Sequence, residues 1–195
     1  GPSKLVYPDE FPTSCPENSI KCVMIGPIPH RGDELTELRF ESSLEQVMAE
    51  VNHWINSEPR TNIIGEWENH THSVFTTKYL RFEDDFIVNG HCDGDSTILY
   101  VYSSSRLGIS DLGLNEKRVD KFHCHSIPSK INRLSCNRTG EYEAATRNST
   151  KLANFNPKST ANEFTSTEST QRETYCAIRT VKRSRKIEEK AFTEF

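Results

Sequence analysis

One amphipathic helix, predicted over residues 42–56, most constrains what this chain can fold into. Ser42 and Glu45 have the spacing of a capping box, and Pro59 prevents the helix from continuing far beyond residue 56. Its apolar residues recur at spacings of three and four and therefore form one stripe. The stripe consists of Leu44, Val47, Met48, Val51, Trp54 and Ile55. Because the opposite face is not basic, core packing is favoured over a membrane surface, and one face of a β-sheet is the natural cover.

Four strand-like segments follow this helix in quick succession. They cover residues 62–67, 72–82, 85–88 and 97–102, and Asn89-Gly90 is predicted to form a turn. Connections this short join antiparallel neighbours, so the segments form a meander. The sequence therefore predicts a two-layer α+β domain in which one amphipathic helix covers a mostly antiparallel sheet.

Two segments flank this core domain, which we place at residues 41–125. Residues 1–40 contain six prolines, which exclude a long helix and favour an extended segment lying on the domain. Residues 126–195 are rich in Ser, Thr and Asn and then become basic, which predicts an irregular C-terminal extension. Only 34% of all residues are hydrophobic, enough for one compact body but not for a core running through the whole chain.

Cysteines and glycosylation motifs indicate the secretory route. Acceptor motifs begin at Asn69, Asn137 and Asn148, and the cysteines are even in number without the C-x-x-C spacing of redox or zinc sites. We predict a disulfide between Cys15 and Cys22 first and one between Cys92 and Cys124 next, with the remaining cysteines anchoring the extension. The six cysteines are Cys15, Cys22, Cys92, Cys124, Cys136 and Cys176. A secreted or luminal glycoprotein is therefore expected.

Charge and hydropathy exclude two classes of partner. The formal net charge is -4, and no basic face appears before Lys182, whereas nucleic-acid binding needs one. No run of about 20 apolar residues is present, so no transmembrane segment is predicted. A small molecule or a lipid remains the expected kind of partner, and the sequence identifies no protein partner.

A polar segment with two glycines follows the last predicted strand. Residues 103–118 have the pattern S-x-S-R-x-G-x-x-D-x-G-x-N-x-x-R, and residues 82–86 upstream are F-E-D-D-F. Together these motifs resemble a widespread uncharacterised family, domain of unknown function 1499, over roughly residues 10–125. The resemblance implies an α+β domain and identifies no chemistry.

The polar side chains of these motifs allow two interpretations. In the first, Arg106 and Arg118 pair with Asp84 and Asp85 as a structural brace that holds the bend in one shape. In the second, the arginines bind an anionic group and the aspartates act as acid or base in an enzyme. The brace is favoured because no nucleophile has an orienting base beside it. The full set is Asp84, Asp85, Ser103, Ser105, Arg106, Asp111, Asn115 and Arg118.

Aromatic residues suggest a different kind of site. Between the helix and the sheet they would line a cavity for a small organic molecule, lipid or chromophore, and the alternative is an ordinary aromatic core. The candidates are Trp54, Trp67, Phe75, Tyr79, Tyr100 and Tyr102. No other cofactor is indicated.

Two pairs of histidines stand two residues apart, a spacing that places both side chains on one face of a strand. The pairs are His70 with His72 and His123 with His125. Such pairs bind zinc or copper in other proteins, but the neighbouring sequon and cysteines explain these segments as well, so no metal is favoured. The function predicted from the sequence is a secreted glycoprotein that binds a small molecule. The alternatives are an enzyme that uses the aspartate and arginine cluster, or an extracellular interaction protein acting through its C-terminal extension.

Overall fold

The computed structural model describes residues 4–108, 111–125 and 136. All of them fall within one compact unit, residues 1–139. The extension predicted over residues 126–195 lies outside the described residues except for Cys136, and so do the acceptor residues Asn137 and Asn148. Within the described part of the chain, no helix is long and apolar enough to cross a membrane.

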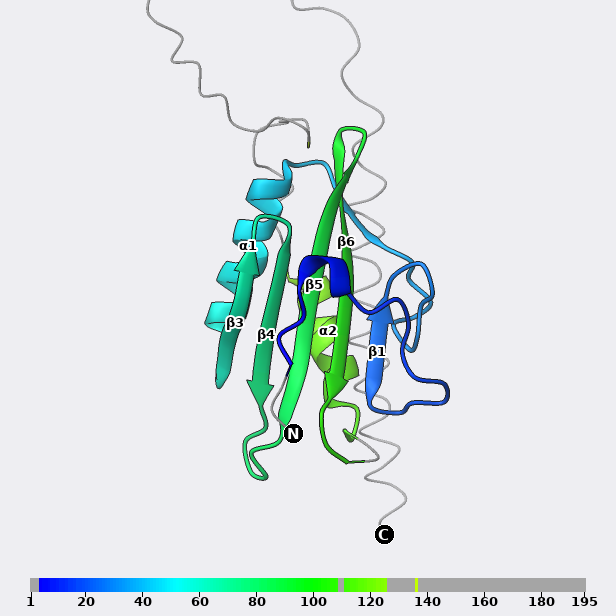
Figure 1. The fold of residues 1–195 in the computed structure, drawn as a ribbon, viewed down its shortest axis with the longest axis vertical. Helices are drawn as coiled ribbons and strands as arrows, with labels where there is room; N and C mark the ends of the chain where they lie inside the picture. The colour runs from blue at the N-terminus through cyan, green and yellow to red at the C-terminus, as the bar shows by residue number, and fades with distance from the viewer. Residues whose placement is uncertain (1–3, 109–110, 126–135, 137–195) are drawn as a thin grey trace, which may run out of the picture. The chain divides into compact units, whose positions relative to one another are not determined.

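Six strands form a single antiparallel sheet (Figure 1). In chain order the strands are β1 (Cys22–Ile25), β2 (Leu38–Phe40), β3 (Thr61–Trp67), β4 (His70–Thr76), β5 (Glu83–Asp93) and β6 (Ser96–Ser105). The order across the sheet is β1-β6-β5-β4-β3, and β2 also pairs with β6. Every pairing between these strands is antiparallel, which confirms the predicted meander and the α+β class.

Two helices, α1 (Leu44–Ser57) and α2 (Leu114–Cys124), cover one face of this sheet (Figure 1). We call this the helix face and the other the outer face. The side chain of Ser43 caps α1 by accepting a hydrogen bond from the backbone of Gln46, one residue later than predicted. The N-terminal segment, with a short 3-10 helix η1 (Pro8–Glu10), crosses the outer face (Figure 1).

The space between the helices and the sheet is filled by aromatic side chains. The ring of Trp54 on α1 lies 6.1 Å from Phe75, 5.5 Å from Phe86 and 4.9 Å from Phe122, measured between centroids. All four side chains are buried together with the apolar stripe of α1. The predicted helix and sheet therefore meet through a packed core, which α2 completes.

Two strand boundaries differ from the prediction. β4 ends at Thr76 instead of residue 82, and β5 runs through Asn89 and Gly90 to Asp93, so that the turn forms at Gly94 with a φ of 61°. A Cβ on Gly90 would lie only 2.7 Å from the side chain of Leu44. Gly90 therefore permits close approach of α1 to the sheet rather than making a turn.

The N-terminal segment contributes more than the extended coil predicted for it. All four residues of β1 are buried, and the strand pairs with β6 at the edge of the sheet. The short strand β2 pairs with another part of β6. Prolines on either side of the apolar run Cys22–Ile25 obscured this strand in the sequence.

The structure contains the predicted disulfide between Cys15 and Cys22 and a second one between Cys92 and Cys136. The predicted pairing of Cys92 with Cys124 is wrong, and Cys124 is disulfide-bonded elsewhere.

The length of α1 explains why Cys92 does not pair with Cys124. Thr97, opposite Cys92 in the sheet, donates a hydrogen bond to the carbonyl of Ser42 just before α1 begins. Lys121, near the end of α2, pairs with Glu58 just after α1 ends. A helix of 14 residues separates these places by about 21 Å, whereas a disulfide requires its Cα atoms within about 7 Å.

Candidate functional site

The predicted polar cluster is divided between the two faces of the sheet. Asp84 and Asp85 are consecutive on β5, so their side chains project from opposite faces. Asp84 pairs with Arg118 on the helix face, and Asp85 pairs with Arg106 on the outer face. The four charged residues thus do not converge on one ligand.

The helix-face pair is buried. Nη2 of Arg118 donates to Oδ2 of Asp84 at 2.9 Å, and the side chain of Asp84 is 1% exposed. The guanidinium also donates to Ser103 and Asn115 and lies 4.4 Å from the ring centroid of Phe75. Burial lowers the pKa of Arg118, while the neighbouring Asp84 carboxylate acts in the opposite direction.

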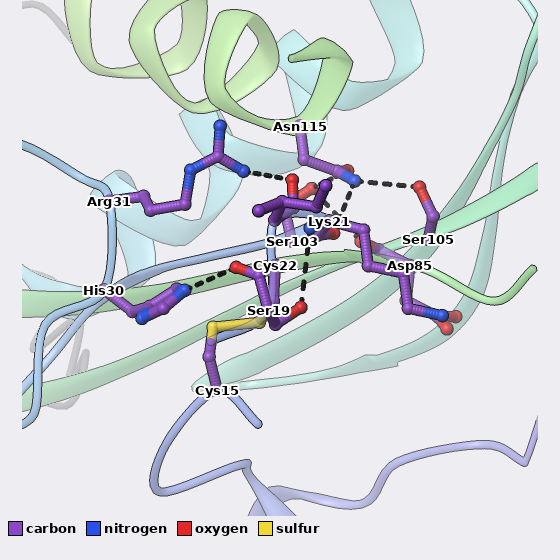
Figure 2. Close-up of a disulfide and its surroundings, with 11 residues drawn as sticks. Cys15, Ser19, Lys21, Cys22, His30, Arg31, Asp85, Ser103, Ser105 and Asn115 are labelled. Carbon is purple, nitrogen blue, oxygen red and sulfur yellow. Dashed lines mark hydrogen bonds between the residues drawn. A yellow bond between two sulfur atoms is a disulfide. The ribbon is translucent and has the colours of Figure 1, made fainter. Parts of the chain in front are cut away.

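Asn115 connects this pair to the edge of the sheet, and Figure 2 shows Asn115 beside Lys21, Ser103 and Ser105. Its amide donates to the carbonyl of Lys21 and to Oγ of Ser105, each at 3.0 Å, and its carbonyl accepts from Ser103 at 2.7 Å. The carboxylate of Asp111 accepts from the backbone N–H of Asn115 at 2.7 Å and so caps the start of α2. Since Lys21 adjoins the Cys15–Cys22 disulfide, the network joins α2, β6 and β1.

The outer-face pair is more accessible. Nε of Arg106 donates to both oxygens of Asp85 at 3.1 Å, and its Nη1 pairs with Glu83. Asp85 also accepts from Nε2 of His72 at 2.8 Å. Burial raises the pKa of Asp85, but the hydrogen bonds from His72 and Arg106 outweigh burial and leave that pKa below its ordinary value of 3.8.

Two buried histidines hold the N-terminal segment on the outer face. The backbone N–H of Val6 donates to Nδ1 of His72 at 3.0 Å, and Nε2 of His70 donates to the carbonyl of Val6 at 3.1 Å. Both imidazoles are fully buried, and their ring nitrogens are occupied by these bonds together with Asp85 and Asn89. The pair therefore acts as a clamp for one residue of backbone.

The other histidine pair lies at the end of α2. His123 is in the last turn and His125 follows the helix, so the spacing of two does not place them on one strand face. In the part of the chain that the structure describes, no group of three or more His, Cys, Asp or Glu residues is arranged to hold a metal.

An aromatic row crosses the outer face at one level of the sheet. Trp67, His70, Asn89 and Tyr100 are successive partners on β3, β4, β5 and β6. Rings from the N-terminal segment and β5 lie against this row. The centroid distances are 5.5 Å for Tyr7 with Trp67, 6.2 Å for Phe11 with His70, 6.4 Å for Phe11 with Tyr100 and 4.9 Å for His91 with Tyr100.

The residues predicted to line a cavity are in three different places. Trp54 and Phe75 belong to the core, and Tyr79 is 83% exposed in the loop between β4 and β5. The other three, Trp67, Tyr100 and Tyr102, are half-buried on the outer face. Sequence reasoning missed Tyr7 and Phe11 and did not connect His91 with this row. The aromatic residues between the prolines of residues 7–12 are the signal that would have drawn attention to this segment.

The comparisons with known proteins identify a family without an activity. The family model described as "Protein of unknown function (DUF1499)" matches residues 13–125, more than half of the chain. The matched range includes β1 to α2 and both polar clusters. No curated protein and no solved structure matches the chain at a significant level.

Proposed function

Since this chain belongs to the DUF1499 family of proteins of unknown function, as its motifs predicted, we propose from its own geometry that it is a secreted binding protein for a planar organic molecule. The proposed site is the aromatic row on the outer face, at Tyr100 and beneath Phe11. The observation that carries the proposal is this row, in which Trp67 and Tyr100 are half-buried on the face that the helices leave uncovered.

The relation between Phe11 and Tyr100 supports a planar ligand. Their ring planes are inclined by 33° and their centroids are 6.4 Å apart. A ring inserted between two others needs about 7 Å, twice the contact distance of about 3.5 Å between carbon atoms. To admit an aromatic ring, Phe11 would therefore have to move away from Tyr100 and bring its plane parallel to that of Tyr100. His91 and the hydroxyl of Tyr100 would offer hydrogen bonds to a polar substituent.

The state of the polar clusters supports binding over catalysis. Arg118, Asp84 and Asn115 bond to one another or to the backbone beneath α2, and Arg106 is committed to Asp85 and Glu83. A general acid or base must be free to reach a substrate. These side chains are instead hydrogen-bonded to other groups of the fold. We therefore assign both clusters a bracing role.

Secretion is supported by the Cys15–Cys22 and Cys92–Cys136 disulfides. The Cys15–Cys22 bridge fixes the N-terminal segment to the edge of the sheet, and the Cys92–Cys136 bridge closes a sequence separation of 44 residues. Disulfides of this kind persist in oxidising compartments. Asn69 lies in the turn between β3 and β4 and is the proposed glycan acceptor among the described residues.

Native mass spectrometry of the protein isolated from its natural source tests the proposal. We expect a bound small organic molecule that is released by denaturation and that rebinds to the emptied protein. Tyr100→Ala should lose rebinding at least tenfold, whereas the matched variant Tyr79→Ala, which removes the same ring from an exposed loop, should bind normally. Bare polypeptide in every preparation, or equal loss in both variants, would contradict the proposal.

A further inference from the structure

A group of exposed apolar side chains lies on two loops at one end of the sheet. The first loop joins β4 to β5, and the second joins β6 to α2 (Figure 1). The loops adjoin one another, because Asp84 pairs with Ser105 and the backbone N–H of Arg106 donates to the carbonyl of Glu83 at 3.1 Å. We call their exposed apolar residues, together with Leu114 at the start of α2, the apolar tip. It consists of Tyr79 (83% exposed), Leu80 (69%), Phe82 (39%), Leu107 (56%), Leu112 (84%) and Leu114 (39%).

The backbone holds these side chains outward at some cost. Arg81 has a φ of 57° and Leu112 a φ of 55°, a left-handed conformation that residues other than glycine and asparagine rarely adopt. The first loop is closed by Thr77, whose N–H donates to the carbonyl of Phe82 at 2.8 Å and whose hydroxyl accepts from the N–H of Phe82. The first loop therefore presents Tyr79 and Leu80 to solvent in a defined conformation.

Two exposed cations lie beside the apolar residues of the first loop. Lys78 and Arg81 flank Tyr79 and Leu80, and among the described residues neither cation pairs with a carboxylate; Lys78 lies 5.2 Å from the ring centroid of Tyr79. Of the nearby acids, Glu83 and Asp85 share Arg106, Glu116 pairs with Arg31, and the buried carboxylate of Asp111 accepts hydrogen bonds from backbone N–H groups. The first loop thus combines projecting apolar groups with two exposed cations that have no carboxylate partner among the described residues.

We propose that the apolar tip docks on an anionic phospholipid surface. The apolar groups would enter the interfacial layer while Lys78 and Arg81 remain at the level of the headgroup phosphates. Two observations favour a bilayer over a folded partner. The apolar groups project from the ends of loops, and a deformable bilayer can accommodate them without a matching concave site. The charges of Lys78 and Arg81 are positive and therefore attract anionic lipid. This interaction is independent of the outer-face site, which lies farther along the strands.

Vesicle co-sedimentation with the full 195-residue chain tests this docking. The probes are phosphatidylcholine vesicles with and without about 30% phosphatidylserine. We expect binding to the anionic vesicles, weaker binding to phosphatidylcholine alone, and loss of binding at high salt. Leu80→Asp should weaken the anionic-vesicle affinity about tenfold or more, because burial of one leucine favours binding by at least that factor. Lys78→Gln combined with Arg81→Gln should abolish the preference for phosphatidylserine.

Ile28→Asp is the matched control, since Ile28 is 60% exposed but lies between β1 and β2, outside the apolar tip. It should bind vesicles as the unaltered chain does, and circular dichroism should show that all variants are folded. The proposal is overturned if the folded chain ignores both kinds of vesicle, or if Ile28→Asp and Leu80→Asp weaken binding equally. It is also overturned if the chain forms a dimer that Leu80→Asp abolishes and does not bind vesicles, because the tip would then contact a second copy.

Discussion

Replacing Arg118 by methionine should destabilise the fold strongly, because it leaves the carboxylate of Asp84 buried without its partner. Asp84 is 1% exposed, and Arg118 is 12% exposed and donates to it at 2.9 Å. Removing one member of such a pair typically costs about 3–5 kcal/mol. For a compact unit of this size, that corresponds to a fall in melting temperature of roughly 10–20 °C.

The double variant Asp84→Asn with Arg118→Met should be less destabilised than Arg118→Met alone, since no charge remains buried. We expect a coupling energy of at least about 1.5 kcal/mol in the double-mutant cycle, measured by urea unfolding at neutral pH. The matched control is Lys121→Met, which breaks a pair with Glu58 on the same helix. Lys121 is 60% exposed, so the cost should stay below about 1 kcal/mol.

Equal destabilisation by Arg118→Met and Lys121→Met would refute the reasoning. It would mean that water reaches Asp84 in the folded state and that the helix-face network is not the brace we describe. A coupling energy near zero would lead to the same conclusion.

Three further predictions concern the clamp formed by His70 and His72, the disulfides, and the N-terminal segment. Burial lowers the pKa of His70 from its ordinary value of 6.5. The neutral imidazole of His70 therefore stabilises the fold fully above about pH 6.5, and this stabilisation is lost as the pH falls toward the lowered pKa. A urea midpoint that is equal at about pH 7.5 and pH 5.5 would contradict this prediction. Replacing the cysteines of Cys92–Cys136 by serine should cost about 4 kcal/mol, and those of Cys15–Cys22 about 2.4 kcal/mol, from their sequence separations of 44 and 7; calorimetry showing the reverse order would contradict the loop-entropy argument. Gly65→Ala would place a Cβ 2.6 Å from the ring of Trp67 and 2.7 Å from Leu5, so proteolysis within the first 20 residues should become faster, and an unchanged rate would count against the packing described.

The sequence predicted the central architecture because periodicity reports burial directly. The apolar residues of α1 form one stripe, and those of β6 that face the helices alternate with residues of the outer face. These patterns made the helix and the meander recognisable. Val119 and Phe122 on α2 are buried in the same core. The Cys15–Cys22 bridge could be predicted because it closes a short local loop.

Other features depend on contacts distant in the sequence, which local patterns do not encode. Asn89-Gly90 has the composition of a turn, but Gly90 is required where α1 approaches the sheet. Cys92 pairs with Cys136 because the β5–β6 turn lies at the far end of α1 from Cys124. These relations follow from the fold as a whole.

The candidate site, too, could be predicted from the sequence only in part. Pairing of Arg106 with Asp85 could be expected from the motifs, but the assignment of Asp84 to the opposite face required the strand register. The roles of His70 and His72 could not be foreseen, because their partner is the backbone of Val6, which no side-chain pattern marks.

Fluorescence of the two single-tryptophan variants tests the proposed outer-face site most directly. The chain has two tryptophans: Trp67, which belongs to the aromatic row, and Trp54, which is 2% exposed in the core on the other face. Titrating the co-purified molecule into Trp54→Phe should change the emission of Trp67, whereas in Trp67→Phe the emission of Trp54 should stay constant. A change confined to Trp54 would place the ligand between helix and sheet and contradict the account.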